Sequence, residues 1–286
     1  MSEVDRRQLT FEQAEGVAPI PSQLALRELS RQLRSRLWAI IYGLLNEHKG
    51  HNDFGYGRSF VGGTFAAILR DYWILHEFNF ADEYTNDFSF WERKLGDIFK
   101  MSSYATVLGF LQFVLRHRNC PHRFSQAIDT ALRYCKAAYF VSGDTILPAA
   151  TDQDKYVVET ALESAKSAGY SGARVHLVRA GEALAQGAWA DSVRESIHAV
   201  ESVTRIISSE GTTLSSALVV LQKKGRMNPN LKRAMNALYD YTSDQHGIRH
   251  ALIFDEADVS ENDALYMFSV CSAFVTYSIR TMREDI

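Results

Sequence analysis

Apolar residues recur every three or four positions along most of the chain, and this spacing predicts a mostly α-helical protein. The clearest helix of the first half is expected to follow Pro21 and a cap at Ser22, with one apolar stripe formed by Leu26, Leu29, Leu33, Leu37, Ile40 and Leu44. Residues 123–134 predict another helix. Residues 139–148 depart from the helical period, because two short apolar runs flank a turn at Gly143. We expect at most this one small β-hairpin.

The second half predicts a helical bundle that forms a domain of its own. Small and polar residues at 151–172 end in the helix breakers Gly169 and Gly172, so this segment is expected to be a linker or connecting helix between domains 1–150 and 173–286. Ser260 and Asp263 have the spacing of a capping box and are expected to open the last helix. The other predicted helices cover residues 173–185, 191–207, 214–223 and 229–241.

Aromatic residues are dense between Phe54 and Phe113, and they have two interpretations. They can fill a helical core, or they can form a platform on which nucleic-acid bases stack. A stacking platform needs exposed rings interleaved with Lys or Arg, and this stretch has few such cations. We therefore expect these rings to pack in the interior.

The composition indicates a globular protein and argues against several other classes. With 286 residues, of which 46% are hydrophobic, the chain can bury an ordinary core, and a net charge of −3 argues against a dedicated DNA-coating protein. Cys120, Cys135 and Cys271 form no Cys-x-x-Cys pair, which is typical of a reduced, cytoplasmic setting. The first residues do not resemble a signal peptide, and the uncharged apolar stretches are shorter than the roughly 20 residues that a membrane-spanning helix needs.

Two apparent motifs do not fit the chemistry they suggest. The glycine-rich segment 55–64 has Gly63 where a phosphate-binding loop needs Lys, and Phe60 where a dinucleotide fingerprint needs its third Gly. His117, Cys120 and His122 can each bind a metal, but no second cluster completes a tetrahedral set. A basic loop with Arg116, Arg118 and Arg123 is the better interpretation of that segment. We therefore expect neither a metal nor a cofactor.

Residues 191–205 predict a helix with an unusually titratable polar face. Val193, Ile197, Val200 and Ile207 share one face, and six polar residues share the other at spacings of three and four: Asp191, Arg194, Glu195, His198, Glu201 and Arg205. One interpretation is a catalytic surface. The other is a solvated helix stabilised by pairs between Asp191 and Arg194 and between Glu201 and Arg205.

A second group of candidate catalytic residues lies in a segment that follows a predicted helix and is expected to form a turn at Gly247. His246, Arg249 and His250 place two imidazoles and a guanidinium within five residues. RNA cleavage without a metal needs a base for the 2′-hydroxyl, an acid for the leaving oxygen and a cation for the phosphate, and these side chains supply all three. Alternatively, His246 or His250 caps the carbonyl groups of the preceding helix.

Three segments resemble one bacterial family. Residues 31–45 (RQLRSRLWAIIYGLL) are similar to the opening helix of the N-terminal domain of AbiJ-type abortive-infection proteins. Residues 191–205 (DSVRESIHAVESVTR) and 239–252 (YDYTSDQHGIRHAL) resemble signatures in the second half of the same family. The resemblance extends over nearly the whole chain. It implies an N-terminal sensor or regulatory domain and a C-terminal HEPN-like helical domain.

The resemblance also implies a function in anti-phage defence, because many HEPN-like domains are metal-independent ribonucleases that dimerise. Arg249 matches the position of the catalytic Arg of that class, but no His lies at the usual four to six residues beyond it. The role of His therefore falls to His250, His246 or His198. We expect a composite site in which Arg249 binds the scissile phosphate, His250 acts as acid or base, and Glu195 and His198 orient it, with Arg194 beside them.

Partners follow from the same interpretation. RNA is the expected substrate, and a local basic patch is expected to bind it: Lys223, Lys224, Arg226, Lys232 and Arg233. A homodimer through the C-terminal domain and a neutralising or activating protein are further expectations. The alternative is a catalytically inactive HEPN-like module that binds RNA, nucleotide or protein, or serves only as a dimerisation scaffold. The missing spacing after Arg249 favours that alternative.

Overall fold

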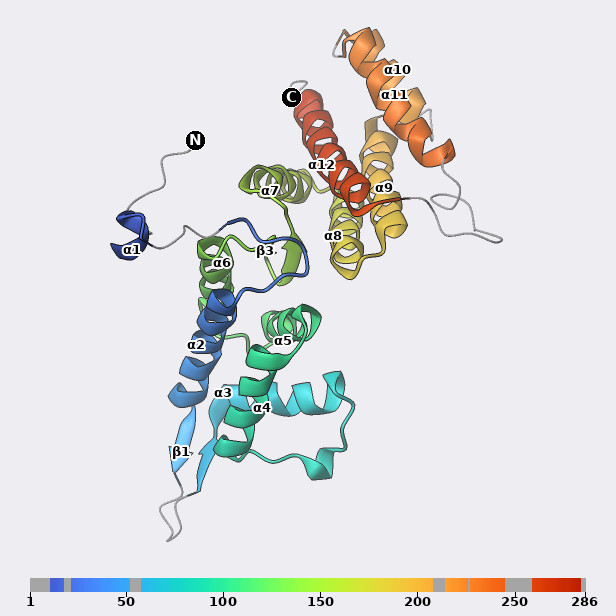
Figure 1. Ribbon diagram of the computed structural model, residues 1–286. Coiled ribbons are helices and arrows are strands. Elements are labelled where there is room, and N and C mark those ends of the chain that lie inside the picture. The colour runs from blue at the N-terminus through green and yellow to red at the C-terminus, as the bar shows by residue number, and fades with distance from the viewer. Residues whose placement is uncertain are drawn as a thin grey trace. The chain divides into compact units, whose positions relative to one another are not determined.

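The computed structural model describes residues 11–17, 22–51, 58–207, 214–225, 227–244 and 259–283. The chain divides into two compact units, 1–146 and 147–286 (Figure 1). The division lies a few residues before the segment 151–172 in which a linker or connecting helix was expected. The predicted fold class is confirmed, because most described residues are in α-helices.

The first unit is built from short helices with two small additions of other structure. Its α-helices are α1 (Phe11–Ala14), α2 (Arg31–Glu47), α3 (Gly63–Asp71), α4 (Phe88–Met101), α5 (Tyr104–Arg116) and α6 (Phe124–Tyr134). A π-helical turn, η2 (Tyr72–His76), and a 3₁₀ turn, η3 (Ala81–Glu83), connect α3 to α4. In this unit α2 packs against α4 and α6 (Figure 1).

Helix α2 begins later than the sequence pattern predicted. Ser30, rather than Ser22, is its N-cap, and the Ser30 hydroxyl accepts a hydrogen bond from the backbone N–H of Leu33 at 3.2 Å. Arg27 has a φ of 67°, which no α-helix accommodates, and its N–H donates to the Tyr139 hydroxyl at 2.9 Å. The buried stripe of α2 is Leu33, Leu37, Ile41 and Leu45. Ile41 and Leu45 therefore take the places that the sequence pattern assigned to Ile40 and Leu44.

The aromatic residues described between Phe54 and Phe113 are buried or half-buried, as predicted, except for Phe78 and Phe80. The buried rings include Phe65, Tyr72, Phe88, Trp91, Phe99 and Phe110. The Trp91 indole donates to the Thr85 carbonyl oxygen at 2.7 Å, so its one polar group is satisfied in the interior. Phe78 and Phe80 are instead 84% and 74% exposed, and Phe78 lies in a turn with a φ of 58°.

Two antiparallel hairpins accompany the helices, one more than expected. The predicted one pairs β3 (Tyr139–Ser142) with β4 (Thr145–Pro148) around Gly143, whose φ is 65°. The other pairs β1 (Lys49–His51) with β2 (Ser59–Val61), and it places Gly50 opposite Phe60. A Cβ atom on Gly50 would lie 2.4 Å from the Phe60 ring, so glycine allows this close approach. The sequence pattern did not predict this second hairpin, because strands of three residues are too short to show an alternation of apolar and polar positions.

The second unit contains the predicted bundle. Its helices are α7 (Asp152–Ser167), α8 (Ser171–Gln186), α9 (Trp189–Ile207), α10 (Leu214–Lys223), α11 (Pro229–Asp244) and α12 (Glu261–Arg283). Helix α7 occupies the expected connecting segment and begins at a capping box formed by Thr151 and Asp154. The predicted capping box at Ser260 is also present: the Ser260 hydroxyl accepts from the N–H of Asp263 at 3.2 Å, and its own O–H donates to the Asp263 carboxylate at 2.6 Å.

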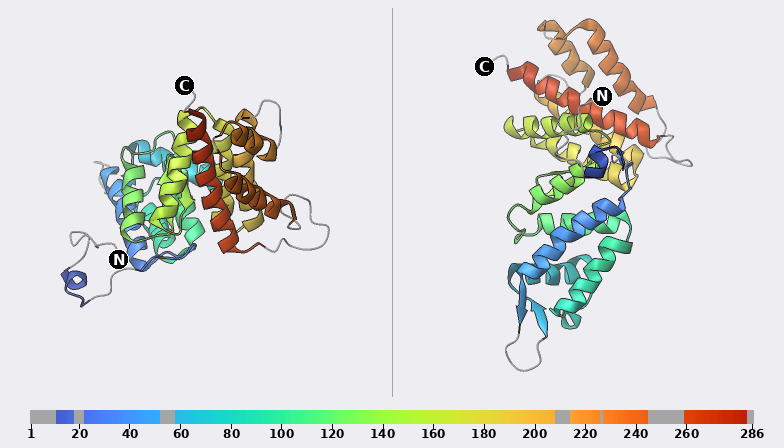
Figure 2. Two further views of the ribbon diagram at one scale, coloured as in Figure 1. Left: turned by 90° about the horizontal axis from the view of Figure 1, so that it is seen from above. Right: turned by 60° about the vertical axis from the view of Figure 1, so that its left-hand side comes forward.

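Helices α7, α8, α9 and α12 enclose the core of this unit, and α10 and α11 pack on α9 (Figures 1 and 2). The core contains Leu162, Leu177, Ile197, Phe268 and Val275. Gly181 lets α8 approach its neighbours, because a Cβ there would lie 2.7 Å from Leu147 and 3.4 Å from Phe268. This packing fixes which faces of α8 and α9 remain accessible.

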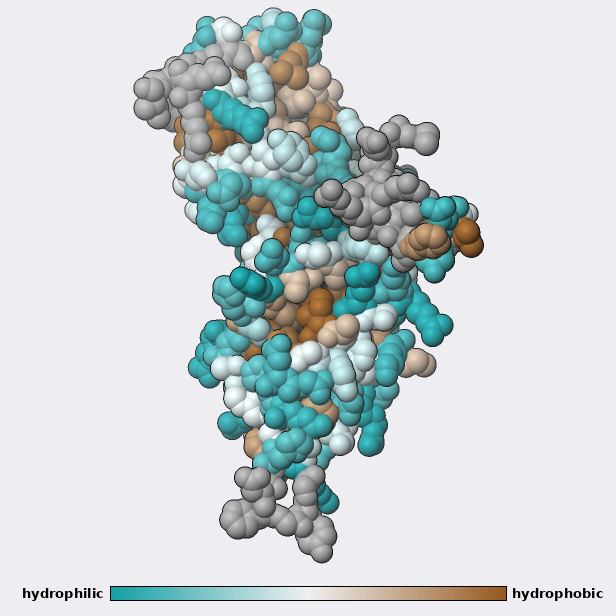
Figure 3. All heavy atoms as spheres, turned by 90° about the vertical axis from the view of Figure 1, so that its left-hand side faces the viewer, coloured by the Kyte–Doolittle hydropathy of each residue, from teal (hydrophilic) through white to brown (hydrophobic). Residues whose placement is uncertain are grey.

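Hydrophilic side chains predominate on the face drawn in Figure 3, with apolar residues in scattered patches between them. Among the described helices, none combines the length and the apolar character that crossing a membrane requires.

Candidate functional site

Helix α9 is oriented by the apolar stripe predicted from its sequence. Val193, Ile197 and Val200 are buried in the bundle. Residues on the other side of the helix are therefore turned away from the core, and Glu195 and His198 are half-buried. The side chain of Ile207 lies outside the described residues.

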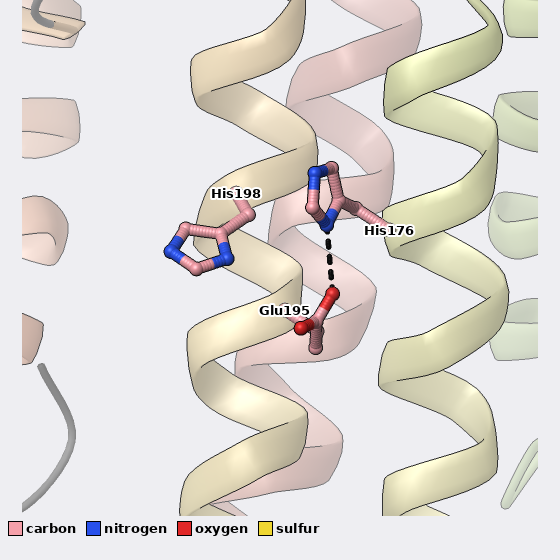
Figure 4. Close-up of side chains that lie close together, drawn as sticks. All are labelled: His176, Glu195 and His198. Atoms are coloured by element: carbon pink, nitrogen blue, oxygen red, sulfur yellow. Dashed lines mark hydrogen bonds and ion pairs between the residues drawn. The ribbon is translucent and has the colours of Figure 1, made fainter.

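His176 on α8 faces this polar side of α9, and it is a residue that sequence reasoning missed. Its Nδ1 lies 2.7 Å from Oε2 of Glu195 (Figure 4). The two side chains are 27% and 22% exposed, so water and a solute can reach them. Because a carboxylate only accepts hydrogen bonds, the Nδ1 proton is directed at Glu195, and Nε2 of a neutral His176 carries the free lone pair.

His198 completes the cluster from one helical turn beyond Glu195. Its ring lies beside that of His176, with centroids 5.3 Å apart and planes at 67°. Figure 4 shows one ring nitrogen of His198 turned toward Glu195, while the ring itself lies along the outer side of α9. One nitrogen from each imidazole and one oxygen of Glu195 lie within 4.8 Å of one another.

This arrangement supports two kinds of chemistry. Two neighbouring imidazoles, one of them held by a carboxylate, can take up a proton and release another. Two His and one Glu are also the ligand set of several zinc enzymes, so these three side chains could hold a divalent transition metal. A metal bound by these side chains would change which of the imidazole nitrogen atoms can carry a proton, so the two uses are alternatives.

The remaining polar residues of α9 contact other side chains or face the solvent. Arg194 Nη1 pairs with the Asp191 carboxylate at 2.8 Å, as the interpretation of a solvated helix predicted. Oε1 of Glu201 accepts a hydrogen bond from the Tyr239 hydroxyl at 2.9 Å, which ties α9 to α11. Arg205 is exposed near the end of the helix. The polar face is therefore partly structural, and its chemically distinctive part is the cluster of His176, Glu195 and His198.

The predicted RNA-binding cations lie on α10 and α11. Lys223 and Lys224 are exposed at the end of α10. On α11, Lys232 Nζ donates to Gln222 Oε1 at 2.9 Å and Arg233 donates to the Asn230 side chain. Arg226 lies outside the described residues.

The predicted turn His246, Arg249 and His250 also lies outside the described residues. The composite site is therefore described only on its α9 side. There, Glu195 and His198 contact His176, a partner other than the turn that was expected.

In the first unit, His117 lies beside a carboxylate, whereas its sequence neighbours had suggested a basic loop. Its Nε2 lies 3.0 Å from the Asp71 carboxylate, and its Nδ1 accepts from the N–H of Asn119 at 3.0 Å. The Cys120 thiol donates to the Pro121 carbonyl oxygen, and partial burial raises the pKa of that thiol. His117 is thus held by hydrogen bonds within its own loop and to Asp71.

A scan against protein-family models and searches of curated proteins and of solved structures found no significant match. The resemblance of residues 31–45, 191–205 and 239–252 to AbiJ-type proteins therefore stays a prediction from the sequence.

Proposed function

We propose that the chain is a ribonuclease of bacterial anti-phage defence, and that its second unit cleaves RNA without a metal at His176, Glu195 and His198. One observation carries this proposal: the 2.7 Å contact between His176 Nδ1 and Glu195 Oε2, with a second imidazole beside it. The resemblance of the sequence to AbiJ-type proteins supports the biological setting, and the cysteines, which form no Cys-x-x-Cys pair, support the proposed cytoplasmic location.

The contact prepares His176 for proton transfer. Glu195 fixes the orientation of the ring and stabilises the imidazolium form once a proton is taken up. Nε2 of His176 is then the nitrogen that removes the proton from a ribose 2′-hydroxyl. The 2′-oxygen attacks the neighbouring phosphorus, a 2′,3′-cyclic phosphate forms, and the bond from phosphorus to the 5′-oxygen breaks.

His198 supplies the second proton transfer. As an imidazolium it gives a proton to the departing 5′-oxygen, so the reaction leaves a 5′-hydroxyl and no net change in charge on the two histidines taken together. The extra negative charge on the phosphate needs a cation. Arg194, next to Glu195 in the chain, and Arg249, from the sequence signature at residues 239–252, are the residues proposed for that role.

Substrate binding and assembly complete the proposal. Exposed Lys223 and Lys224 supply positive charge on α10, which packs on α9, and they are proposed to contact the RNA backbone. The described part of the unit also exposes five large apolar side chains: Tyr156 at 63%, Val175 at 44%, Ile206 at 52%, Leu231 at 37% and Tyr266 at 58%. These are candidates for a dimer interface or for contact with a regulatory protein.

The test is cleavage of labelled tRNA and mRNA in EDTA by the wild type and by His176→Ala and His198→Ala. General acid–base catalysis contributes about 10²- to 10⁴-fold, so each variant should lose at least about 100-fold in rate. His122→Ala removes an exposed histidine of the first unit and should cleave like the wild type. Light scattering and circular dichroism check that all four proteins share one oligomeric state and helix content.

Three outcomes would overturn the proposal in different ways. Activity that disappears in EDTA and returns with Zn²⁺ would show that the cluster works as a metal site. RNA that is bound but not cleaved by the wild type would identify a catalytically inactive binding module. Cleavage that is equally fast in all variants would place the active site elsewhere in the chain.

A further inference from the structure

A groove in the first unit runs along α2 where that helix packs against α4. It has a volume of about 610 Å³ and is lined by Leu29, Arg31, Arg34, Ser35, Trp38 and Lys100. Helices α2 and α4 lie side by side at this place (Figure 1). The volume falls within the range of small-molecule binding sites, which is about 300 to 1,000 Å³.

The lining is cationic, with one aromatic ring. Arg31, Arg34 and Lys100 face the groove, and no carboxylate is among its lining residues. Three cations in a lining without a carboxylate favour an anionic ligand, because mutual repulsion among them is relieved when the anion binds.

Arg34 is held in place for such a ligand. Its Nε donates to the Leu29 carbonyl oxygen at 3.3 Å and its Nη1 to the Phe99 carbonyl oxygen at 3.1 Å. Both acceptors are neutral backbone groups, so the guanidinium keeps its full charge, and it has further N–H groups available for an anion. The planar fork of a fixed Arg loses little entropy when it binds phosphate.

Trp38 gives the groove a flat apolar surface. Its ring is half-buried, packed against Tyr42 at 5.5 Å and Phe99 at 6.0 Å between centroids. Lys100 Nζ lies 5.6 Å from the Trp38 ring, in a cation–π contact. A heteroaromatic base can take the place of the Lys100 ammonium on this ring, and the long Lys side chain can then turn to the phosphate.

We propose that this groove binds a nucleoside phosphate, with the phosphate on Arg31, Arg34 and Lys100 and the base against Trp38. The proposal goes beyond the proposed ribonuclease function, since it concerns a separate site in the other unit. It makes the first unit a sensor of a small nucleotide.

A neighbouring hollow argues for a mononucleotide rather than an RNA strand. This hollow, of about 410 Å³, shares Trp38 and Lys100 with the groove but also contains Glu92 and Asp97. The two carboxylates would repel the phosphates of a chain that continued in that direction.

The test is isothermal titration of the full chain with ATP, AMP, adenosine, inorganic phosphate and a short single-stranded RNA. ATP or AMP should bind more tightly than either adenosine or phosphate alone. Arg31→Ala and Lys100→Ala should each weaken binding about tenfold or more, because each removes a charged hydrogen-bonding partner. Trp38→Leu should weaken binding comparably, and Trp38→Phe should keep most of it.

Arg118→Ala, which removes an exposed Arg from a loop of the same unit, is the matched control and should bind like the wild type. The proposal is wrong if no nucleoside phosphate binds, if the three groove variants bind like the wild type, or if phosphate alone binds as tightly as ATP. It is also wrong if the groove variants weaken the binding of RNA more than that of any mononucleotide. RNA bound at the second unit would not respond to these variants, and the mononucleotide titrations involve no RNA cleavage, so the test is independent of the function proposed for the second unit.

Discussion

His176 on α8 and Glu195 on α9 are joined by a hydrogen bond across two helices, with Nδ1 and Oε2 2.7 Å apart. Neither side chain is deeply buried, so the pair is accessible to a substrate. A contact of this kind between half-exposed groups adds little to stability. Its geometry is better suited to orienting an imidazole for chemistry.

The substitution Glu195→Gln distinguishes a role of the contact in catalysis from a role in stability. The amide keeps the size of the side chain but loses the charge that stabilises the His176 imidazolium, so the rate of RNA cleavage should fall about 100-fold. The free energy of unfolding should change by less than about 1 kcal/mol. Cleavage assays and urea denaturation measure the two quantities on the same preparation.

Glu163→Gln is the matched control for this substitution, because Glu163 is an exposed carboxylate on α7 that accepts a hydrogen bond from the Ser167 hydroxyl. It should leave the cleavage rate unchanged. A large loss of stability in Glu195→Gln, with cleavage at the wild-type rate, would make the pair structural and would contradict the proposed role.

Ser260→Ala removes the capping box at the start of α12. The variant leaves the N–H of Asp263 without its side-chain acceptor, and such losses cost about 1 kcal/mol. Helix α12 packs against α7, α8 and α9, so we expect the loss to appear in the unfolding of the whole second unit. Urea denaturation at pH 7 tests this, and unchanged stability would show that the helix start is supported by packing alone.

The same capping box predicts that the stability of the second unit depends on pH. Hydrogen bonds from the Ser260 hydroxyl and backbone N–H lower the pKa of Asp263 below its ordinary value of about 4. The ionised carboxylate is the form that accepts these bonds, so its stabilising effect is present above that ordinary value and is lost as the pH falls through the lowered pKa. The stability difference between wild type and Ser260→Ala should therefore shrink below about pH 4, as urea denaturation at several pH values would show. A difference that stayed constant to lower pH would contradict the contribution of the carboxylate.

The three thiols should react with a disulfide reagent at different rates. Burial raises the pKa of Cys271 to about 12, and it also raises the pKa of Cys135, so both thiols are protonated at pH 8 and shielded. Cys120 is only partly buried, and it should react first. Cys120→Ser should remove the fast phase in the native protein, and denaturation should expose the remaining thiols. Rapid reaction of Cys271 in the native state would contradict the packing of α12.

Much of the second unit follows from local sequence signals. The stripe of Val193, Ile197 and Val200 identified both α9 and its buried face, because burial on one side of a helix repeats with the period of the helix. Ser260 and Asp263 identified the start of α12, because a capping box depends only on residues three apart.

Other features depend on contacts between distant segments. His176 is an isolated histidine in the sequence of α8, and its pairing with Glu195 depends on how α8 and α9 are aligned, which neither helix encodes alone. The start of α2 was misassigned because Ser22 and Ser30 are both acceptable caps. The choice is made by a tertiary contact, the bond from the Arg27 N–H to Tyr139.

The most direct test of the central claim is the chemistry of the product ends after digestion of RNA in EDTA. Attack by the 2′-oxygen with two imidazoles transferring protons predicts 2′,3′-cyclic phosphate and 5′-hydroxyl ends. It also predicts no cleavage where a 2′-deoxynucleotide replaces the nucleotide at the cut. Products with 3′-hydroxyl and 5′-phosphate ends, or the complete absence of cleavage in EDTA, would contradict metal-independent catalysis by His176 and His198.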